Sequence, residues 1–340
     1  DGYGFVERIG FYEQVYEEAF RNRVKAQFKQ VQRTPEISAV EQELTEIHAL
    51  AVKNLLAKYG NPHVDFIGFH GQTITHEPEN GFTWQIGDGP LLARETGIDV
   101  VCDFRSADVA AGGQGAPLIP LYHKALAEAA GLKKPCAILN IGGVANVTFI
   151  GEGENDILAF DTGPGNALMD DFILERLGVP YDKDGRLAAE GVENKDCIDA
   201  FLRAAYFDAV PPKSLDRGAW HPEVSLLSNE DGMATLQGCT RESIIKATQH
   251  FSAPAKAWYV CGGGRKNASL MKGLRDRLGV PVEPVDTLGW DGDALEAEGF
   301  AYLAVRSHLG LPLSLPSTTG VKAPQTGGVY HKAGKDGPLV

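Results

Sequence analysis

Residues 136–172 read CAILNIGGVANVTFIGEGENDILAFDTGPGNALMDDF and decide the fold. The apolar runs on either side of Gly142-Gly143 predict two β-strands, and a third short strand is expected to end on Asp161. A glycine-rich turn follows, and a helix begins near Asn166. This order places one carboxylate and a bare-backbone turn at a single strand end, where α/β proteins build ligand sites. A nucleotide-dependent enzyme is the first hypothesis.

The composition predicts a globular protein with room for more than one core. A chain of 340 residues favours two domains or a duplicated α/β unit. No segment has the roughly 18 consecutive apolar residues of a membrane span. The first residues, DGYGFVERIG, lack the basic start and the apolar stretch of a signal peptide. We therefore expect a cytoplasmic protein without a membrane partner.

Charge and cysteine usage exclude two further classes. The net charge of -13 is not offset by any Lys/Arg block, which argues against a nucleic-acid partner. The cysteines lack C-x-x-C spacing, so buried free thiols explain them better than disulfides or a zinc site. These cysteines are Cys102, Cys136, Cys197, Cys239 and Cys261.

Strand, glycine-rich loop and helix recur in both halves of the chain, which indicates an α/β protein with two related sheets. Near the start, helical spacing predicts a helix from Phe11 and a second one that Gly60 ends. Later, TRESIIKATQHF predicts a helix with Thr240 as its cap. ALEAEGFAYLAVRSHLG supplies a late helix before a loop-like tail from Leu311.

Asp161-Thr162-Gly163-Pro164-Gly165-Asn166 is the first candidate site. Glycines without side chains let backbone N–H groups approach an anionic or sugar ligand, and Asp161 could take a proton from an attacking group. The motif fits equally well an aspartate that only stabilises the turn through its own backbone.

A second candidate site, Gly262-Gly263-Gly264-Arg265-Lys266-Asn267, follows a strand and precedes a helix. Such a run can lie flat against an adenine or ribose, with Asn267 forming hydrogen bonds at the helix entrance. Its spacing matches neither G-x-G-x-x-G nor the P-loop. Taken alone, it is better explained as a tight turn.

The third candidate site joins His70-Gly71-Gln72-Thr73 with Arg105 and Asp108, at successive strand ends. Polar side chains there suit a hydroxyl-rich ligand, and Arg105 could pair with a carboxylate. A purely structural His70 is the alternative. A zinc site of His70 and His76 is not expected, because no third ligand has suitable spacing.

Glu296 and Glu298 form the fourth candidate site, on the late helix. Two residues apart, they point to different faces, so at most one of them faces a ligand.

Taken together, these motifs resemble the anhydro-N-acetylmuramic acid kinase family. The resemblance is ordered and covers essentially the whole chain. It rests on FHGQT, DFRSADVAAGGQGAPL, LNIGGVANVT, AFDTGPGN, YVCGGGRKN and LEAEGFAYLA, with TTGVKAP in the tail.

The resemblance implies a two-domain α/β fold of the sugar kinase and actin-like (ribonuclease H-like) class, with an interdomain cleft for ATP and substrate. We expect residues 1–135 and 303–340 to form domain I, and 136–302 to form domain II. The implied reaction opens 1,6-anhydro-N-acetylmuramic acid with water and phosphorylates O6, in cell-wall recycling. A related amino-sugar kinase and a non-catalytic nucleotide-binding protein are the alternatives.

The resemblance also assigns roles to residues. Asp161 becomes the general base. The residues implied on the sugar side are Thr73, Arg105 and Glu296, and Arg105 is a candidate partner of the lactyl carboxylate. The expected nucleotide-binding residues are Asn140, Gly142, Gly143, Gly163, Gly165, Gly262, Gly263, Gly264 and Asn267. ATP and Mg²⁺ are the expected cofactors, since phosphoryl transfer needs charge neutralisation between the phosphates. No protein metal site is predicted, and a homodimer is possible.

Two departures from the family pattern set a condition on this expectation. The family begins with a strand and a G-T-S-x-D-G loop that cradles the ATP phosphates, whereas this sequence opens on Asp1-Gly2. We therefore expect the chain as written to lack an upstream segment and to bind phosphates poorly. KSLDRGAW also departs from the usual K-S-T-G-R-E, although Lys213, Ser214 and Arg217 are in place.

Overall fold

A computed structural model describes residues 1–214, 218 and 220–334, and the chain divides into two compact units. Unit 1 comprises Asp1–Ala129 with Glu296–Val340, and unit 2 comprises Ala130–Leu295. Compact units need not coincide with domains that fold or move as one. The domain limits predicted at 135/136 and 302/303 therefore stay a prediction.

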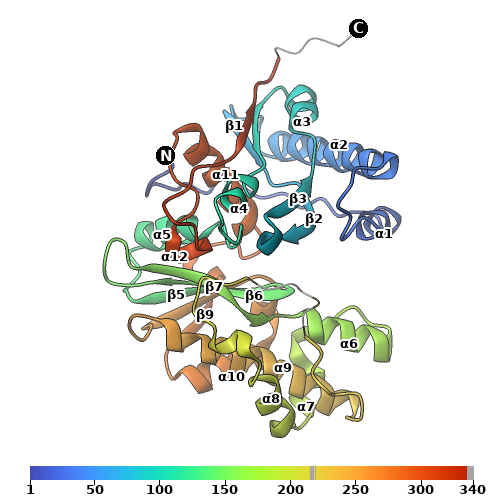
Figure 1. Ribbon diagram of the computed structural model, residues 1–340, viewed down its shortest axis with the longest axis vertical. Helices are drawn as coiled ribbons and strands as arrows, with labels where there is room; N and C mark the ends of the chain where they lie inside the picture. Colours follow the sequence, from blue (N-terminus) through green and yellow to red (C-terminus); the bar gives the residue numbers. More distant parts are fainter. Residues whose placement is uncertain (215–217, 219, 335–340) are drawn as a thin grey trace. The chain divides into compact units, whose positions relative to one another are not determined.

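Unit 2 is built around a five-stranded mixed sheet with the strand order β7-β6-β5-β8-β9 (Figure 1). β5 pairs antiparallel with β6 and parallel with β8. In chain order unit 2 contains β5 (Cys136–Ile141), β6 (Val144–Ile150), β7 (Ile157–Pro164), α6 (Ala167–Leu177), η2 (Lys183–Gly185), α7 (Arg186–Glu190), α8 (Lys195–Phe201), η3 (Ala205–Asp208), α9 (Asn229–Ala247), η4 (Thr248–His250), β8 (Ala257–Cys261), η5 (Gly263–Lys266), α10 (Ala268–Leu278), β9 (Val282–Pro284) and η6 (Val285–Leu288).

The apolar runs of β5 and β6 form the core of unit 2. Almost every residue of β5 is buried, as expected of a central strand that is covered on both faces. α9 and α10 lie along one face of the sheet (Figure 1), and Ile244 and Leu274 of these helices pack on Leu139 and Trp258. The predicted strand–turn–strand order around Gly142-Gly143 is confirmed.

Unit 1 has a three-stranded sheet with the order β1-β4-β10 and a separate β2–β3 hairpin. In chain order it contains α1 (Glu18–Lys25), α2 (Pro35–Lys58), β1 (Phe66–Phe69), β2 (Gln72–Glu77), η1 (Pro78–Asn80), β3 (Phe82–Ile86), α3 (Gly89–Thr96), β4 (Asp99–Cys102), α4 (Ser106–Ala110), α5 (Pro120–Ala129), α11 (Leu295–His308), α12 (Pro316–Thr319) and β10 (Val329–His331). α2 and α3 pack on β1 and β4 through Ala49, Leu92 and Val100, all buried. The mixed α/β class predicted from the sequence is confirmed.

The prediction of a helix from Phe11 is wrong, because α1 begins only at Glu18. The backbone of Phe11 bonds instead to the end of α2: its N–H donates to Tyr59 Oη at 3.2 Å, and its carbonyl accepts from Lys58 Nζ at 2.9 Å. Tertiary contacts thus satisfy the groups that a helical turn would have paired. The predicted end of the second helix at Gly60 is confirmed, since α2 stops at Lys58.

Thr240 does not cap a helix, contrary to the prediction. α9 starts eleven residues earlier, at Asn229, where the Ser228 hydroxyl accepts from the Asp231 N–H at 3.0 Å. Its small, buried residues carry no clear amphipathic pattern, so its beginning was hard to see in the sequence. The late helix is confirmed as α11.

No helix in the described part of the chain is both long and apolar enough to cross a membrane.

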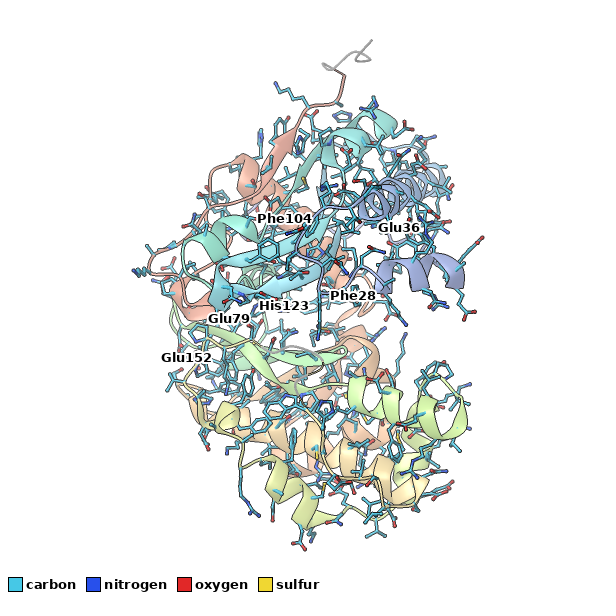
Figure 2. All side chains as sticks on the ribbon, turned by 45° about the vertical axis from the view of Figure 1, so that its right-hand side comes forward. Phe28, Glu36, Glu79, Phe104, His123 and Glu152 are labelled. Carbon is cyan, nitrogen blue, oxygen red and sulfur yellow. The ribbon has the colours of Figure 1, made fainter. Side chains whose placement is uncertain are left out.

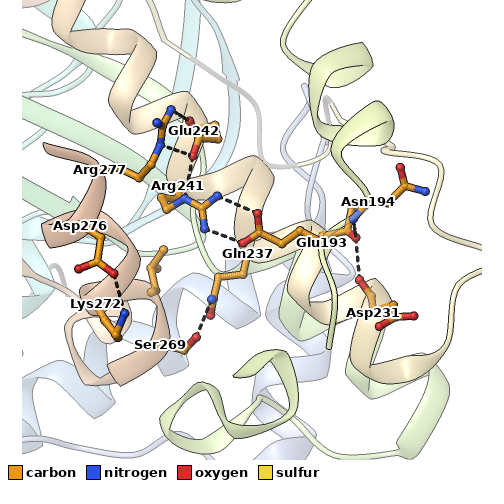
Figure 3. A network of polar contacts seen from close by, with 12 residues as sticks. Glu193, Asn194, Asp231, Gln237, Arg241, Glu242, Ser269, Lys272, Asp276 and Arg277 are labelled. Atoms are coloured by element: carbon orange, nitrogen blue, oxygen red, sulfur yellow. Dashed lines mark hydrogen bonds and ion pairs between the residues drawn. The ribbon is translucent and has the colours of Figure 1, made fainter. Parts of the chain in front are cut away.

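An ion network holds α9, α10 and the segment before α8 together in unit 2 (Figure 3). Arg241 donates to both carboxylate oxygens of Glu193, at 2.6 and 2.9 Å, and to Glu242 at 2.8 Å. Arg277 of α10 donates to the same Glu242 at 2.6 and 3.0 Å. Burial alone would raise the pKa of Glu242, but the bonds from Arg277 and Arg241 lower it overall. The charged form of Glu242 therefore stabilises the fold.

We expect Glu242→Gln to lower the free energy of unfolding of the protein by about 1–3 kcal/mol at neutral pH, because charge-assisted bonds are lost. The folded pKa lies below the unfolded value, so this stabilisation is present above pH ~4.3 and is lost as the pH falls through the folded pKa. Denaturant unfolding of both proteins from pH 7 to pH 3 should show the difference shrinking. Glu283→Gln is the matched control, because its pair with Arg275, at 3.9 Å, is exposed. If the difference in unfolding free energy between the two proteins stays constant with pH, the charge of Glu242 does not have this role.

Candidate active site

Three glycine-containing turns meet at one end of the sheet of unit 2. They are the β5–β6 turn at Gly142-Gly143, the end of β7 at 163–166, and the turn after β8 at 262–264. The Gly165 N–H donates to the Gly143 carbonyl at 2.9 Å, and the Asn166 N–H donates to the Gly142 carbonyl at 2.7 Å. The structure therefore brings together, within unit 2, the glycines that the sequence predicts for the nucleotide.

Two of these glycines leave no room for a side chain. A Cβ on Gly165 would lie 2.3 Å from the Gly142 carbonyl oxygen. Gly262 has φ +73°, and a Cβ there would lie 2.5 Å from Asn140 Oδ1. Only glycine allows backbone to approach backbone this closely. These glycines therefore let the turns at this end of the sheet pack directly against each other and against β5.

Two asparagines tie the turns to the sheet. Asn166 Nδ2 donates to the Ile141 carbonyl at 3.1 Å, and so links the DTGPGN turn to β5. Asn140 lies opposite Cys261 in the parallel β5–β8 ladder, and the Cys261 thiol points at Asn140 Oδ1 at 3.8 Å. Thr240, predicted as a cap, instead donates from Oγ1 to the Gly165 carbonyl at 2.9 Å from within α9.

Asp161 is buried, with 7% of its surface exposed, and lies inside β7. The prediction that the strand ends on Asp161 is wrong, because β7 continues to Pro164 through a bulge opposite Ala145 and Asn146. Bulges re-aim side chains next to active sites. The bulge therefore makes the buried Asp161 a candidate for a functional role.

Tyr206 and Lys213 hold the backbone of Asp161. The Tyr206 hydroxyl donates to the Asp161 carbonyl at 2.6 Å, and the Asp161 N–H donates to the Lys213 carbonyl at 3.0 Å. The Lys213 ammonium donates to the Tyr206 carbonyl at 2.7 Å and lies 4.6 Å from the Tyr206 ring centroid. Burial lowers the pKa of Lys213 to about 8. Burial and the nearby Asp161 raise the pKa of Tyr206 above its ordinary value.

Sequence reasoning missed Tyr206 entirely and noted Lys213 only as part of a motif. A tyrosine 45 residues from Asp161 gives no spacing signal, since only the fold brings the two together. Arg217, from the same motif as Lys213, lies outside the described residues.

A cavity of about 490 Å³ adjoins the turn after β8. Its volume is typical of a small-molecule site. It is lined by Asn166, Met169, Asp170, Tyr181, Asp182, Lys183, Asp184, Gly263, Lys266 and Asn267. Gly263 and Asn267, both predicted to contact the nucleotide, thus share one cavity within unit 2.

Asn267 also has a structural role, because its Oδ1 accepts from the Leu270 N–H at 2.9 Å and caps α10. The neighbouring cations are committed to carboxylates: Arg265 bonds Asp286 and Asp293, and Lys266 bonds Asp293. Arg265 also donates to the Gly262 carbonyl at 3.0 Å. These cations therefore shape the turn after β8.

Unit 1 carries the residues predicted for the sugar. Thr73 lies on β2, where Gln85 Nε2 of β3 donates to its hydroxyl at 3.2 Å. Arg105 directly precedes α4, and its guanidinium donates to His70 Nε2 at 2.9 Å and to the Gly115 carbonyl at 2.6 Å. His70 and Arg105, predicted as one cluster, are thus in direct contact.

The two glutamates of α11 differ in their surroundings. Glu298 accepts from Arg8 Nε at 2.8 and 2.9 Å and from the Tyr122 hydroxyl at 2.7 Å. Glu296 is exposed. Glu298 is therefore engaged within unit 1, which leaves Glu296 as the better candidate for a ligand. Its role stays a prediction.

Residues 11–333 match the family model for anhydro-N-acetylmuramic acid kinase. An anhydro-N-acetylmuramic acid kinase of Rhizorhabdus wittichii is 49% identical over 341 residues, which cover 98% of this chain and 93% of the relative. A protein of the same description from Paramagnetospirillum magneticum is 54% identical over 301 residues, covering 87% of this chain and 84% of the relative.

Solved structures match less closely. The ethanolamine utilization protein EutJ from Carboxydothermus hydrogenoformans has a TM-score of 0.39 at 12% identity and covers 77% of this chain and 74% of its own. An inorganic polyphosphate/ATP-glucomannokinase from Arthrobacter sp. strain KM has a TM-score of 0.33 at 17% identity. The match covers 78% of this chain and 84% of the glucomannokinase chain. Scores this low carry no structural conclusion.

We expect Gly165→Ala to lower the free energy of unfolding by about 1–3 kcal/mol, because its Cβ would collide with a backbone carbonyl that cannot move aside. Thermal unfolding measures the effect. Gly142→Ala is the matched control, since its nearest neighbour would lie at an ordinary 3.6 Å. Equal melting temperatures of the two variants would show that the turns do not meet as described.

Proposed function

The chain belongs to the anhydro-N-acetylmuramic acid kinase family, and from this premise we propose that it opens 1,6-anhydro-N-acetylmuramic acid with water and phosphorylates the sugar at O6 with ATP. The product is N-acetylmuramic acid 6-phosphate, and the reaction serves cell-wall recycling. The observation that carries the proposal within this chain is the meeting of the Asp161 strand with the glycine turns beside the 490 Å³ cavity.

Asp161 is the general base of this proposal. It takes a proton from water while the water oxygen bonds to the anomeric carbon. The bond from that carbon to the bridging oxygen breaks, and this oxygen stays on C6 and accepts the γ-phosphoryl group of ATP as ADP departs. The bonds from Tyr206 and Lys213 to the Asp161 backbone support the role, because a general base must be held in position.

ATP would place its adenosine against Gly262, Gly263, Gly264 and Asn267, beside the cavity. Its phosphates would lie near the peptide groups of Asn140, Gly142, Gly143, Gly163 and Gly165. The meeting of the glycine-containing turns at one end of the sheet supports this assignment.

Magnesium would enter with the nucleotide. In the described part of the chain, no group of three or more His, Cys, Asp or Glu side chains could hold a metal alone. Mg²⁺ usually keeps several waters and binds through phosphates with one or two carboxylates. Bound there, it would neutralise charge between the β- and γ-phosphates.

Thr73, Arg105 and Glu296 are the proposed sugar residues, with Arg105 meeting the lactyl carboxylate. The polar partners of Thr73 and Arg105 in unit 1 support this, since they fix both side chains before a ligand arrives. A homodimer and a cytoplasmic location are further expectations, to be checked by light scattering and by cell fractionation.

Asp161→Asn should lower kcat by about 10²–10⁴-fold, because a general base is lost. ATP affinity should stay within about threefold, since Asp161 is not assigned to the nucleotide. Product formation from the anhydro sugar and nucleotide titration measure the two effects. Turnover near that of the unaltered protein would refute the assignment of the base. N-acetylmuramic acid, offered in parallel, distinguishes an ordinary amino-sugar kinase.

Two substitutions of different size at Gly263 test where the nucleotide binds. A Cβ there would lie 3.5 Å from Asn166 Nδ2, so Gly263→Ala should leave the KM for ATP nearly unchanged. Gly263→Leu should fill part of the cavity and raise this KM about tenfold or more, with little change in the KM for the sugar. An equal KM for ATP in both variants would show that the nucleotide does not bind against Gly263.

A further inference from the structure

Asn166 stands at the N-cap position of α6, yet its side chain makes no capping hydrogen bond. The first helical N–H, of Ala167, donates instead to the Gly143 carbonyl of the β5–β6 turn, at 3.2 Å. Asn267 shows the usual arrangement: at the N-cap of α10, its Oδ1 accepts from the Leu270 N–H at 2.9 Å. The helix therefore does not use the side chain of Asn166.

One hydrogen bond fixes which way the Asn166 amide points. Its Nδ2 donates to the Ile141 carbonyl at 3.1 Å, and a carbonyl can only accept, so the NH₂ group must lie on this side. Oδ1 then lies on the other side of the amide, and no N–H or O–H group of the described residues donates to it. Asn166 is half-buried and lines the 490 Å³ cavity. Its Oδ1 is thus a fixed acceptor that is left for a ligand.

Asn166 is close to the turns on both sides of the proposed nucleotide site. Its N–H donates at 2.7 Å to the carbonyl of Gly142, in the turn proposed for the phosphates. A Cβ on Gly264, in the turn proposed for the adenosine, would lie 3.3 Å from Asn166 Oδ1. Glu152, labelled in Figure 2, follows the other end of β6 and marks the end of this strand that is remote from the turns. Since the ribose joins the base to the phosphates, it is the part of ATP expected beside Asn166.

An acceptor such as Oδ1 can pair only with a hydrogen-bond donor. Phosphate oxygens and the ring nitrogens of adenine are acceptors, so they gain nothing from this oxygen. The donors of ATP are the two ribose hydroxyls and the amino group of the base. The amino group lies on the side of adenine that points away from the ribose. A ribose hydroxyl is therefore the donor that fits a position beside the phosphate turn.

We propose that Asn166 recognises the ribose of the nucleotide: its Oδ1 accepts a hydrogen bond from the 2′- or the 3′-hydroxyl and so favours the ribonucleotide over the analogue that lacks this hydroxyl. The proposal rests on the proposed function for the location of the nucleotide, and it adds a specificity-determining residue. A nucleotide without the hydroxyl would leave the acceptor unpaired in the cavity, which lowers affinity.

Calorimetric binding of ADP, 2′-deoxy-ADP and 3′-deoxy-ADP tests the proposal. The unaltered protein should bind one of the two deoxy ligands about five- to tenfold more weakly than ADP. In Asn166→Ala this ratio of affinities should fall to about one. The ratio is the readout because a merely structural role of Asn166 would weaken all three ligands alike. Lys183→Ala is the matched control, since Lys183 is exposed and lines the same cavity, and it should keep the ratio.

The proposal is wrong if the unaltered protein binds ADP no better than either deoxy ligand. It is also wrong if the ratio survives in Asn166→Ala or is lost in Lys183→Ala. Purine riboside 5′-diphosphate, which lacks the amino group, is a fourth ligand. If Asn166→Ala removes a preference for ADP over this ligand instead, Oδ1 faces the base and not the ribose.

Thermal unfolding of each variant identifies a folding defect. If Asn166→Ala does not fold, Asn166→Ser replaces it, because serine suits an N-cap position and its shorter side chain does not reach the position of Oδ1. The same loss of the ratio is then expected, and its survival refutes the role. The proposed function fails separately, if the unaltered protein forms no ATP-dependent product from the anhydro sugar, because that result leaves the ribose preference measurable.

Discussion

The close approach of two backbone segments, at Gly142 and Gly165, is the constraint on which the candidate site depends. The carbonyls of Gly142 and Gly143 accept the N–H groups of Asn166 and Gly165, so the end of β7 must lie on the β5–β6 turn. A side chain on Gly165 would prevent this contact. Once it forms, α6 starts beside the turn after β8, and the cavity gains one of its walls.

The backbone of Asp161, close to this contact in β7, is held by side-chain and backbone bonds within unit 2. Asp161 lies one bulge before the contact, and its backbone is bonded by Tyr206 and by Lys213 from a distant segment. Unit 2 therefore fixes the position of Asp161 through its main chain, without help from the ligand. A general base held in this way, as we propose for Asp161, would lose little entropy when substrate binds.

How far the sequence predicts this protein depends on the range of the interactions. The strand pair around Gly142-Gly143 and the glycine turns were predicted correctly, because short apolar runs and glycines signal locally. The start of α1, the start of α9 and the end of β7 were not. At the first and the last of these places a distant partner decides: Tyr59 for Phe11, and β6 for the bulge after Asp161. The start of α9 has a local cap, Ser228, but its small buried residues give no amphipathic pattern. The support of Arg105 by Gly115 likewise depends on Asp108 and the tail, which no local pattern links.

Three arginines of this chain differ in the hydrogen-bond partners of their guanidinium groups. Arg241 and Arg265 are held by carboxylates, which raise the pKa of each guanidinium and join separate segments of unit 2. These pairs stabilise the fold, since both charges are largely balanced where they lie. Arg105 is oriented by an imidazole and a carbonyl instead. Its two acceptors come from separate segments of unit 1, so the fold itself sets the direction of this guanidinium.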